Sequence, residues 1–342
     1  MNKPPGSDPF MKGFSWGFPG QRGEFAHPES LESLRAMRDL GVEWVTICFG
    51  ARMDSLEATE IAFGDAEETM VTDDEIRHAV GQARALGLRV VLKPMVETRE
   101  GVWRGLIKHA SEADLAVWWQ SFEAFLVHYA HIAEECGCDM FCLGCEMGSM
   151  EPYADRWRKV TSAVRGVFSG RVTYNANHDR VWDVAWWDAV DIISISAYYP
   201  VGRGADSTVA EMQASWVPVR KKLAALAQAS GKPVFFIEIG MMSAEGCSLY
   251  PHKWDSDAPY APDEQARFYE AALSTFWEDS WFAGFFWWKW DARPSLVETA
   301  SKNSRKAKVV GERGFRISGK PAEATLRRWY ARPRVAAEAA AR

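Results

Sequence analysis

Two glutamates stand out because each lies at the end of an apolar, strand-like run. Glu146 follows Phe-Cys-Leu-Gly-Cys at 141–145, and Glu238 follows Val-Phe-Phe-Ile at 234–237. A carboxylate in such surroundings is costly to bury unless it is paired or hydrogen-bonded. Two opposed carboxyl groups are the chemical groups that hydrolyse glycosidic bonds. The pair therefore predicts a shared site at one edge of a sheet or barrel.

The rest of the chain alternates between strand-like and helical segments. Strands are expected at 13–18, 44–49, 89–95, 139–147, 171–177, 191–199, 234–241 and 283–290, and helices at 28–40, 72–86, 111–136, 153–168, 182–189, 208–230, 262–279 and 321–330. Thr72, followed three residues later by Glu75, is typical of a capping box. Eight nearly continuous apolar strands alternating with helices predict the α/β class and a single (β/α)8 TIM barrel. We expect one domain over residues 1–342, with a core at about 10–333.

Residues that do chemistry in such a barrel lie at the C-terminal ends of the strands, which we call the rim, and on the loops that follow. Glu146 and Glu238 end the fourth and seventh strands. Tyr198 shares strand parity with Ser194 and Ser196, whose small side chains suit a barrel interior. The other rim positions with aromatic, amide or basic side chains include Trp16, Lys93, Asn175, Asn177, Tyr199, Trp287, Trp288 and Trp290.

Composition excludes several classes of partner. The formal net charge is −6 and the sequence pI is about 5.8, so nothing favours a nucleic-acid partner, and we expect the short basic stretch 302–308 to be a solvated loop. The N-terminal residues lack the apolar region of a signal peptide, and no apolar run reaches the length of a membrane span. We therefore expect a soluble, cytoplasmic protein.

The seventeen tryptophans exceed what a core needs, and flat indole faces suit stacking on sugar rings.

Four of the six cysteines fall within ten residues: Cys136, Cys138, Cys142 and Cys145. Zinc sites favour paired Cys-x2-Cys units across a loop. Cys142 and Cys145 lie three residues apart in one expected strand, which predicts that they point to opposite faces. We expect reduced, mostly buried thiols and neither a metal nor a cofactor.

Several segments in order along the chain resemble glycoside hydrolase family 113, the β-mannanase family of the clan A retaining glycosidases. The resemblance extends from Lys12 to Glu323. Its most specific parts are the segments 92–94, 102–105, 139–146, 173–177, 231–233, 238–240 and 284–290. It implies a (β/α)8 barrel, a retaining mechanism and β-1,4-linked mannose substrates.

The resemblance implies roles for the two glutamates, and the positions of other residues suggest roles beside them. Glu146 is expected as acid/base and Glu238 as nucleophile, with a hydrogen bond from Tyr198 keeping Glu238 ionised. Lys93 and Arg104 are candidates for bonding sugar hydroxyls, and Lys93 is equally a candidate for a structural ion pair. Trp287 or Trp288 is expected to floor the sugar site, and Trp16 and Trp103 are further stacking candidates.

Two positions depart from the pattern of similar chains. Cys145 stands where clan A enzymes usually carry the Asn that hydrogen-bonds the sugar 2-hydroxyl, so Asn177 becomes the candidate for that contact, and Met95 stands where similar chains often carry His. These departures keep a second sugar open, a β-glucoside or an amino sugar. A third possibility is a non-catalytic carbohydrate-binding barrel, but such a barrel would usually have lost one of the two glutamates. Endo or exo action, transglycosylation and oligomeric state stay open.

Overall fold

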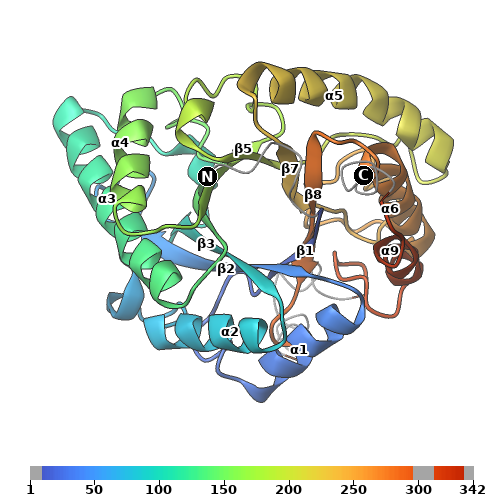
Figure 1. Cartoon of the computed structure of the whole chain (residues 1–342), viewed down its shortest axis with the longest axis horizontal. Coiled ribbons are helices and arrows are strands. Elements are labelled where there is room, and N and C mark those ends of the chain that lie inside the picture. Colours follow the sequence, from blue (N-terminus) through green and yellow to red (C-terminus); the bar gives the residue numbers. More distant parts are fainter. Residues whose placement is uncertain (1–9, 296–311, 335–342) are drawn as a thin grey trace, which may run out of the picture.

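Eight parallel strands close into a barrel in the order in which they occur along the chain (Figure 1). The computed structural model describes residues 10–295 and 312–334, so the predictions for the stretch 302–308 and for the ends of the chain lie outside the described residues. The strands are β1 (Met11–Trp16), β2 (Trp44–Met53), β3 (Arg89–Thr98), β4 (Met140–Cys145), β5 (Arg171–Asn177), β6 (Ile192–Ser196), β7 (Val234–Ile239) and β8 (Phe282–Trp290). The predicted (β/α)8 fold is confirmed.

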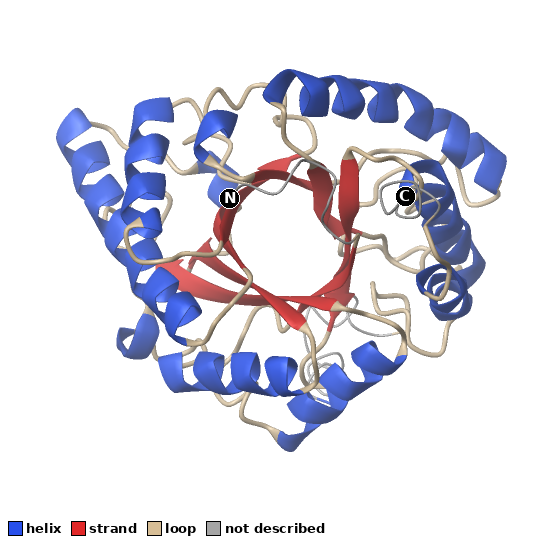
Figure 2. Cartoon of the chain, viewed as in Figure 1, coloured by secondary structure: helices blue, strands red, loops and turns tan. Residues whose placement is uncertain are grey.

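Helices surround this barrel on the outside (Figure 2). They are α1 (Pro28–Asp39), α2 (Asp73–Ala85), α3 (Glu112–Glu135), α4 (Ala154–Arg165), α5 (Val209–Ser230), α6 (Pro262–Phe276) and α9 (Pro321–Tyr330). The predicted capping box is present before α2, where Thr72 and Glu75 exchange side-chain and backbone hydrogen bonds. Among the helices in the described parts of the chain, none has the length and apolar character that a bilayer span requires.

The helix expected at 182–189 is wrong. Only a single 3-10 turn forms there, η3 (Trp187–Ala189). Trp186 and Trp187 are both buried, and the indole of Trp186 stacks on Trp157 of α4 with 4.5 Å between ring centroids. Nε1 of Trp186 donates to the carbonyl of Glu151, and Nε1 of Trp187 donates to the carbonyl of Val181, so partners outside a regular helix hold both indoles. Tertiary packing therefore replaces the local helical preference.

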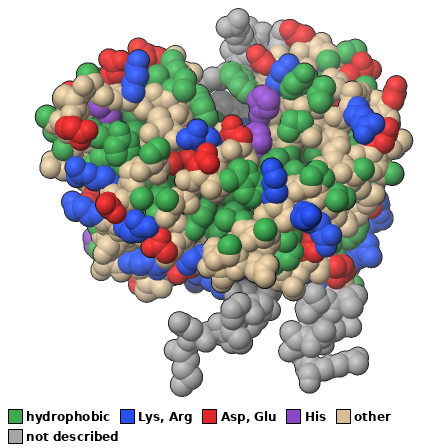
Figure 3. Space-filling view, turned by 90° about the horizontal axis from the view of Figure 1, so that it is seen from above, with side chains coloured by type: hydrophobic (Ala, Val, Ile, Leu, Met, Phe, Trp, Pro, Cys, Tyr) green, Lys and Arg blue, Asp and Glu red, His purple; other side chains and the backbone are tan. Residues whose placement is uncertain are grey.

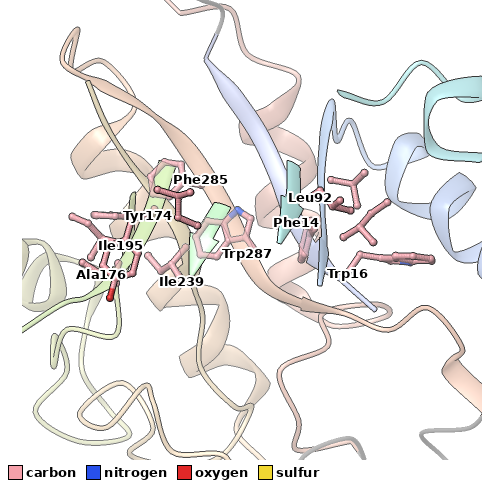
Figure 4. Packing of buried hydrophobic residues seen from close by; sticks show 14 of the residues in the cluster. Phe14, Trp16, Leu92, Tyr174, Ala176, Ile195, Ile239, Phe285 and Trp287 are labelled. Atoms are coloured by element: carbon pink, nitrogen blue, oxygen red, sulfur yellow. The ribbon is translucent and has the colours of Figure 1, made fainter. Parts of the chain in front are cut away.

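Two apolar layers form the core. Inside the barrel lies a cluster of Met11, Trp44, Val91, Met140, Cys142, Ile192, Phe235, Ile237 and Phe286. Alternate side chains point outward and pack beneath the helices, and Figure 4 shows several of them, including Phe14, Leu92, Tyr174 and Phe285. Strand parity therefore decides which residues reach the inside of the barrel.

β-Bulges in β4 and β7 change this parity near the rim. Along β4, Cys142 pairs with Thr173 and Cys145 pairs with Asn175, so three residues of β4 span two residues of β5. Cys142 and Cys145 consequently both point inward, which corrects the prediction that they point to opposite faces. An extra residue inserted into one strand of a pair re-aims the side chains that follow it.

The face seen in Figure 3 carries charges of both signs. Lys and Arg side chains are interspersed there with Asp and Glu, and hydrophobic side chains lie between them. This face offers no broad basic surface of the kind that binds polyanions.

Candidate active site

Glu238 reaches the interior because of the second bulge, in β7. Phe235 pairs with Ser194, and Glu238 pairs with Ser196. Between these two pairs β7 therefore advances by three residues while β6 advances by two. Glu238 is 4% exposed. Without the extra residue, its side chain would share parity with Phe236, which packs outward among Trp216 and Phe276. The bulge therefore converts an outward position into one that faces the barrel mouth.

Residues from three other strands of the barrel provide polar partners for this buried carboxyl group. Lys93 of β3 forms an ion pair with its Oε1 atom. Tyr198, just after β6, donates from its hydroxyl to Oε2 over 2.8 Å, and Nδ2 of Asn175 in β5 donates to Oε1 over 3.3 Å. The predicted hydrogen bond from Tyr198 is therefore present.

These partners determine the charge of Glu238. Burial alone would raise the pKa of its carboxyl group, but the charge and hydrogen bond of Lys93 and the hydrogen bond of Tyr198 outweigh burial and hold the pKa below its ordinary value. Burial likewise opposes the charge of Lys93, and the negative charge of Glu238 more than reverses this, so the pKa of Lys93 is raised. The pair is therefore a carboxylate beside an ammonium group.

Glu146 lies immediately after β4 with a backbone φ of 54°, the left-handed region that residues other than glycine rarely adopt. Its backbone N–H donates to the carbonyl of Asn175 over 2.8 Å. Its Oε2 atom accepts a hydrogen bond of 3.1 Å from Nε1 of Trp103 and lies 3.9 Å from Nη2 of Arg104. Such strained conformations concentrate at functional sites.

The pKa of Glu146 moves in the opposite direction. Burial raises it, and the negative charge of Glu238 raises it further, while Arg104 and hydrogen bonds from Ser196 and Trp103 only partly compensate. The site thus holds two neighbouring carboxyl groups, one whose pKa is raised and one whose pKa is lowered. This division is the arrangement that acid–base catalysis by two carboxyl groups requires.

A hydrogen-bonded loop holds Glu146 in its left-handed conformation. The N–H of the next residue, Met147, donates to the hydroxyl of Tyr174 over 3.0 Å, and that hydroxyl donates to Oε1 of Glu151 over 2.8 Å. Burial raises the pKa of Glu151 to about 7. Farther along, Ser149 donates from its backbone N–H to the carbonyl of Gly105 over 3.0 Å. The loop after β4 is therefore tied both to β5 and to the loop that follows β3.

Cys145 lies between the two glutamates. Its thiol donates to Oε1 of Glu238 over 3.5 Å and accepts from Nδ2 of Asn175 over 3.0 Å and from Nη2 of Arg104 over 3.2 Å. Burial raises its pKa well above the ordinary value, so the group is a neutral thiol. Arg104 also donates from Nε to the Cys145 carbonyl over 2.7 Å and pairs with Glu97.

Several candidates from the sequence take other positions than expected. Lys93 is fully buried and forms an ion pair with Glu238. Of the two roles considered for Lys93, a contact with sugar hydroxyls or a structural ion pair, the structure contains the ion pair. Arg104 is 7% exposed and ties β4 to Glu97 rather than projecting toward solvent. Asn177 accepts a hydrogen bond at Oδ1 from the backbone of His178. Asn175, two residues earlier, makes the contact with Glu238.

Trp16 and Trp287 are not available for stacking on a sugar, which corrects both predictions. Each is fully buried and points outward (Figure 4). Trp16 donates to Ser33 of α1, and Trp287 stacks on Tyr269 of α6 with 3.7 Å between centroids. Their strand parity places them under the helices, opposite in direction to the site.

Trp288 follows Trp287 in the strand, so its side chain points to the opposite face, toward the site. It is partly buried, its ring centroid lies 5.9 Å from Nζ of Lys93, and it packs against a small cluster of Cys48, Met95 and Cys145. Trp103, in the loop after β3, is 41% exposed. These two indoles therefore lie beside the two carboxyl groups, Trp288 near Glu238 and Trp103 on Glu146.

Asn175 and Cys145 are site residues that sequence reasoning did not select. Asn175 shares parity with Thr173 inside β5, which was a usable signal, whereas the position of Cys145 depends on the β4 bulge. In the described parts of the chain, no group of three or more His, Cys, Asp or Glu is arranged to hold a metal ion, and the cysteines are free thiols.

Comparisons with known proteins agree with this geometry. A model of glycoside hydrolase family 113 matches residues 14–311. The structure is similar to the family 113 β-mannanase AaManA from Alicyclobacillus acidocaldarius in complex with ManMIm, with 37% identity, a TM-score of 0.83, and coverage of 96% of this chain and 99% of that chain. A complex of a family 113 β-1,4-mannanase is similar at 32% identity, with a TM-score of 0.82 and coverage of 95% of this chain and 100% of that chain.

More distant structures share the fold alone. A β-glucuronidase from Faecalibacterium prausnitzii is 17% identical, with a TM-score of 0.61 over 96% of this chain and 50% of that chain. A comparison with curated protein sequences found no match. Because the family model covers most of the chain and two mannanase structures are more than 30% identical over nearly all of it, the chain belongs to glycoside hydrolase family 113 and is an enzyme of the glycoside hydrolase type.

Proposed function

We propose that the protein is a retaining hydrolase of β-1,4-linked mannan or mannooligosaccharides, with Glu238 as nucleophile and Glu146 as acid/base. The observation that carries this proposal is a pair of neighbouring carboxyl groups at the barrel mouth whose different partners shift their pKa values in opposite directions, upward for Glu146 and downward for Glu238. The similar proteins are described as β-mannanases, one of them bound to ManMIm, which supports mannose as the sugar.

In the first step of this mechanism, the Glu238 carboxylate forms a bond to the anomeric carbon as the glycosidic bond breaks. Glu146 gives its proton to the departing oxygen, which leaves with the bonding electron pair. In the second step Glu146, now a carboxylate, takes a proton from water, and that water displaces Glu238 from the anomeric carbon. Two inversions at the same carbon retain its configuration.

Glu238 is suited to the first step because its negative charge is already stabilised. The ammonium group of Lys93 and the hydroxyl of Tyr198 bind different oxygens of the carboxylate. Glu146 is suited to proton donation because burial and the charge of Glu238 favour its protonated form. When Glu238 becomes an ester, its charge disappears, so the pKa of Glu146 falls and Glu146 becomes the base of the second step.

Lys93→Met tests the stabilisation of the nucleophile. Removing the ammonium group leaves burial as the dominant influence on Glu238, so the pKa of Glu238 rises. We expect the acidic limb of the kcat/KM profile to move to higher pH, because the carboxylate then forms only at higher pH. Breaking one side of a buried ion pair also costs about 3–5 kcal/mol of unfolding free energy at neutral pH. Hydrolysis rates from pH 3 to 9 and urea unfolding measure the two effects.

Lys289→Met is the matched control for this experiment. Lys289 pairs with the buried Asp291 over 2.8 Å and contacts Phe18, without a contact to either glutamate. Its loss should lower stability and leave the acidic limb in place. An unmoved acidic limb in Lys93→Met would contradict the role given to Lys93.

A second candidate keeps the mechanism and changes the sugar. Cys48, Met95 and Cys145 form a weakly polar wall beside Trp288, and two of them, Met95 and Cys145, are the positions where the sequence departs from similar chains. A wall of this kind favours a glucoside or an amino sugar if it replaces polar contacts that mannose needs. Aryl β-mannoside, β-glucoside and N-acetyl-β-glucosaminide separate the candidates, and an inert mannoside would remove mannan as the substrate.

A digest of mannohexaose followed by NMR tests the leading proposal as a whole. We expect shorter mannooligosaccharides whose new reducing ends are first released in the β configuration and then mutarotate. The size profile reports endo or exo action. Initial release of the α anomer would exclude the retaining mechanism.

A further inference from the structure

The indole of Trp103 lies beside Glu146 and is nevertheless open to solvent. Its Nε1 donates to Oε2 of Glu146 over 3.1 Å, and 41% of the residue is exposed. Trp16 and Trp287, the indoles that end β1 and lie in β8, are fully buried. Trp103 therefore presents a free aromatic surface attached directly to one of the two carboxyl groups.

The backbone holds this ring in a defined orientation. A Cβ atom added to Gly105 would lie 2.4 Å from Cη2 of Trp103, so the indole packs directly over the glycine backbone. Gly105 is in turn tied to the loop after β4 by the hydrogen bond from Ser149. Ring, glycine and acid/base thus form one connected unit, which lowers the entropic cost of binding a ligand on the ring.

The two indoles beside the site lie near different carboxyl groups. Trp288 lies near Lys93, the ion-pair partner of Glu238. Trp103 is bonded to Glu146, whose proton goes to the oxygen that joins the two sugars. A surface attached to the acid/base is therefore next to the sugar that leaves, and sugars present apolar C–H faces that pack on aromatic rings.

We propose that Trp103 is the binding platform for the sugar on the leaving-group side of the scissile bond, and that its N–H directs the transferable proton to the other oxygen of Glu146. This inference rests on the function proposed above. Because Oε2 accepts the indole hydrogen bond, Oε1 carries the proton of the acid. In the second step the same platform receives a sugar acceptor in competition with water, so it also promotes transfer between sugars.

Trapping the covalent intermediate separates the platform from the chemistry. With 2-deoxy-2-fluoro-β-mannosyl fluoride, the Glu238 oxygen forms a bond to the anomeric carbon while fluoride leaves with the electron pair. Fluoride is too small to contact a sugar platform and needs little proton donation. We expect Trp103→Ala to be labelled at Glu238, by mass spectrometry, within about twofold of the wild-type rate.

Reactivation of the labelled enzyme then reports on the leaving-group side, because an acceptor sugar must bind there. Mannobiose should speed wild-type reactivation with saturation. In Trp103→Ala and in Gly105→Ala, which displaces the ring, we expect the half-saturating mannobiose concentration to rise about tenfold, equivalent to about 1.4 kcal/mol. Trp103→Phe keeps a flat ring and should stay within about threefold of wild type.

Trp103→Phe tests the second half of the proposal. The hydrogen bond from Trp103 lowers the pKa of Glu146, so its loss raises that pKa. Since Glu146 must be protonated to act as the acid, the basic limb of mannohexaose hydrolysis should move to higher pH. A basic limb that stays at its wild-type pH would overturn the role of the N–H.

Trp182→Ala is the matched control. Trp182 is also exposed, at 38%, but its ring lies 5.8 Å from Nζ of Lys222 in the second half of α5. The half-saturating mannobiose concentration of the Trp182→Ala enzyme should equal that of the wild type. The platform is overturned if Trp103→Ala is labelled normally and retains wild-type saturation by mannobiose. Absence of labelling at Glu238 in the wild-type enzyme would instead overturn the proposed function.

Discussion

Glu238→Ala should lower turnover of mannooligosaccharides by about 10⁴-fold or more, because the variant lacks the group that forms the covalent intermediate. Added azide should restore activity by entering the space left by the carboxylate. A single attack by azide inverts the anomeric carbon, so the product is an α-mannosyl azide. Rates with 2,4-dinitrophenyl β-mannoside and NMR of the product measure both effects.

Glu264→Ala provides the matched control for loss of a buried carboxyl group. Glu264 is 1% exposed and accepts hydrogen bonds from the N–H groups of Gly246 and Ser248, outside the catalytic pair. It should lose stability and gain no activity from azide. A Glu238→Ala enzyme that kept most of its activity, or a β-configured azide product, would show that another residue is the nucleophile.

Glu146→Ala should lower turnover of mannohexaose by about 10²–10⁴-fold, the usual range for general acid–base catalysis. The loss should be much smaller for the first step with 2,4-dinitrophenyl β-mannoside, whose leaving group needs no proton. The covalent intermediate then accumulates, because water is no longer activated. Azide, which needs no base, should release it as a β-mannosyl azide.

The shape of the pH profile gives an independent test of Glu146. Since its raised pKa controls proton donation, the basic limb of kcat/KM should be lost for the aryl substrate in Glu146→Ala. The acidic limb, which reports ionisation of Glu238, should remain. Equal losses on both substrates together with an unchanged basic limb would rule out Glu146 as the acid/base.

Much of the fold follows from local patterns in the sequence. Apolar runs of strand length mark all eight strands, and the boundaries of β5 and α9 agree with the structure to the residue. The capping box of Thr72 and Glu75 was predictable because both halves of it lie within one helical turn. The conformation of the segment 182–189 was not predictable, because the burial of Trp186 and Trp187 depends on α4.

Residue type and strand position were enough to anticipate which polar groups lie together at the barrel mouth. Lys93 and Tyr198 contact Glu238 there, as polar groups at strand ends should. The sequence could not tell which of the adjacent indoles of β8 faces the site. The inward and outward positions of a strand depend on its register with its neighbours, and the closed barrel sets that register. Trp287 therefore lies under the helices, and Trp288 lies near Glu238.

The amino-acid sequence by itself determined the eightfold alternation of strands and helices and the two carboxyl groups that end strands, because apolar periodicity and the cost of burying charge are local properties. Only the tertiary structure decided which way those carboxyl groups point and how they are charged. The bulges in β4 and β7 arise from pairing with β5 and β6. The opposite pKa shifts of Glu146 and Glu238 depend on Lys93, Tyr198 and Arg104, which only the closed barrel brings into contact with them.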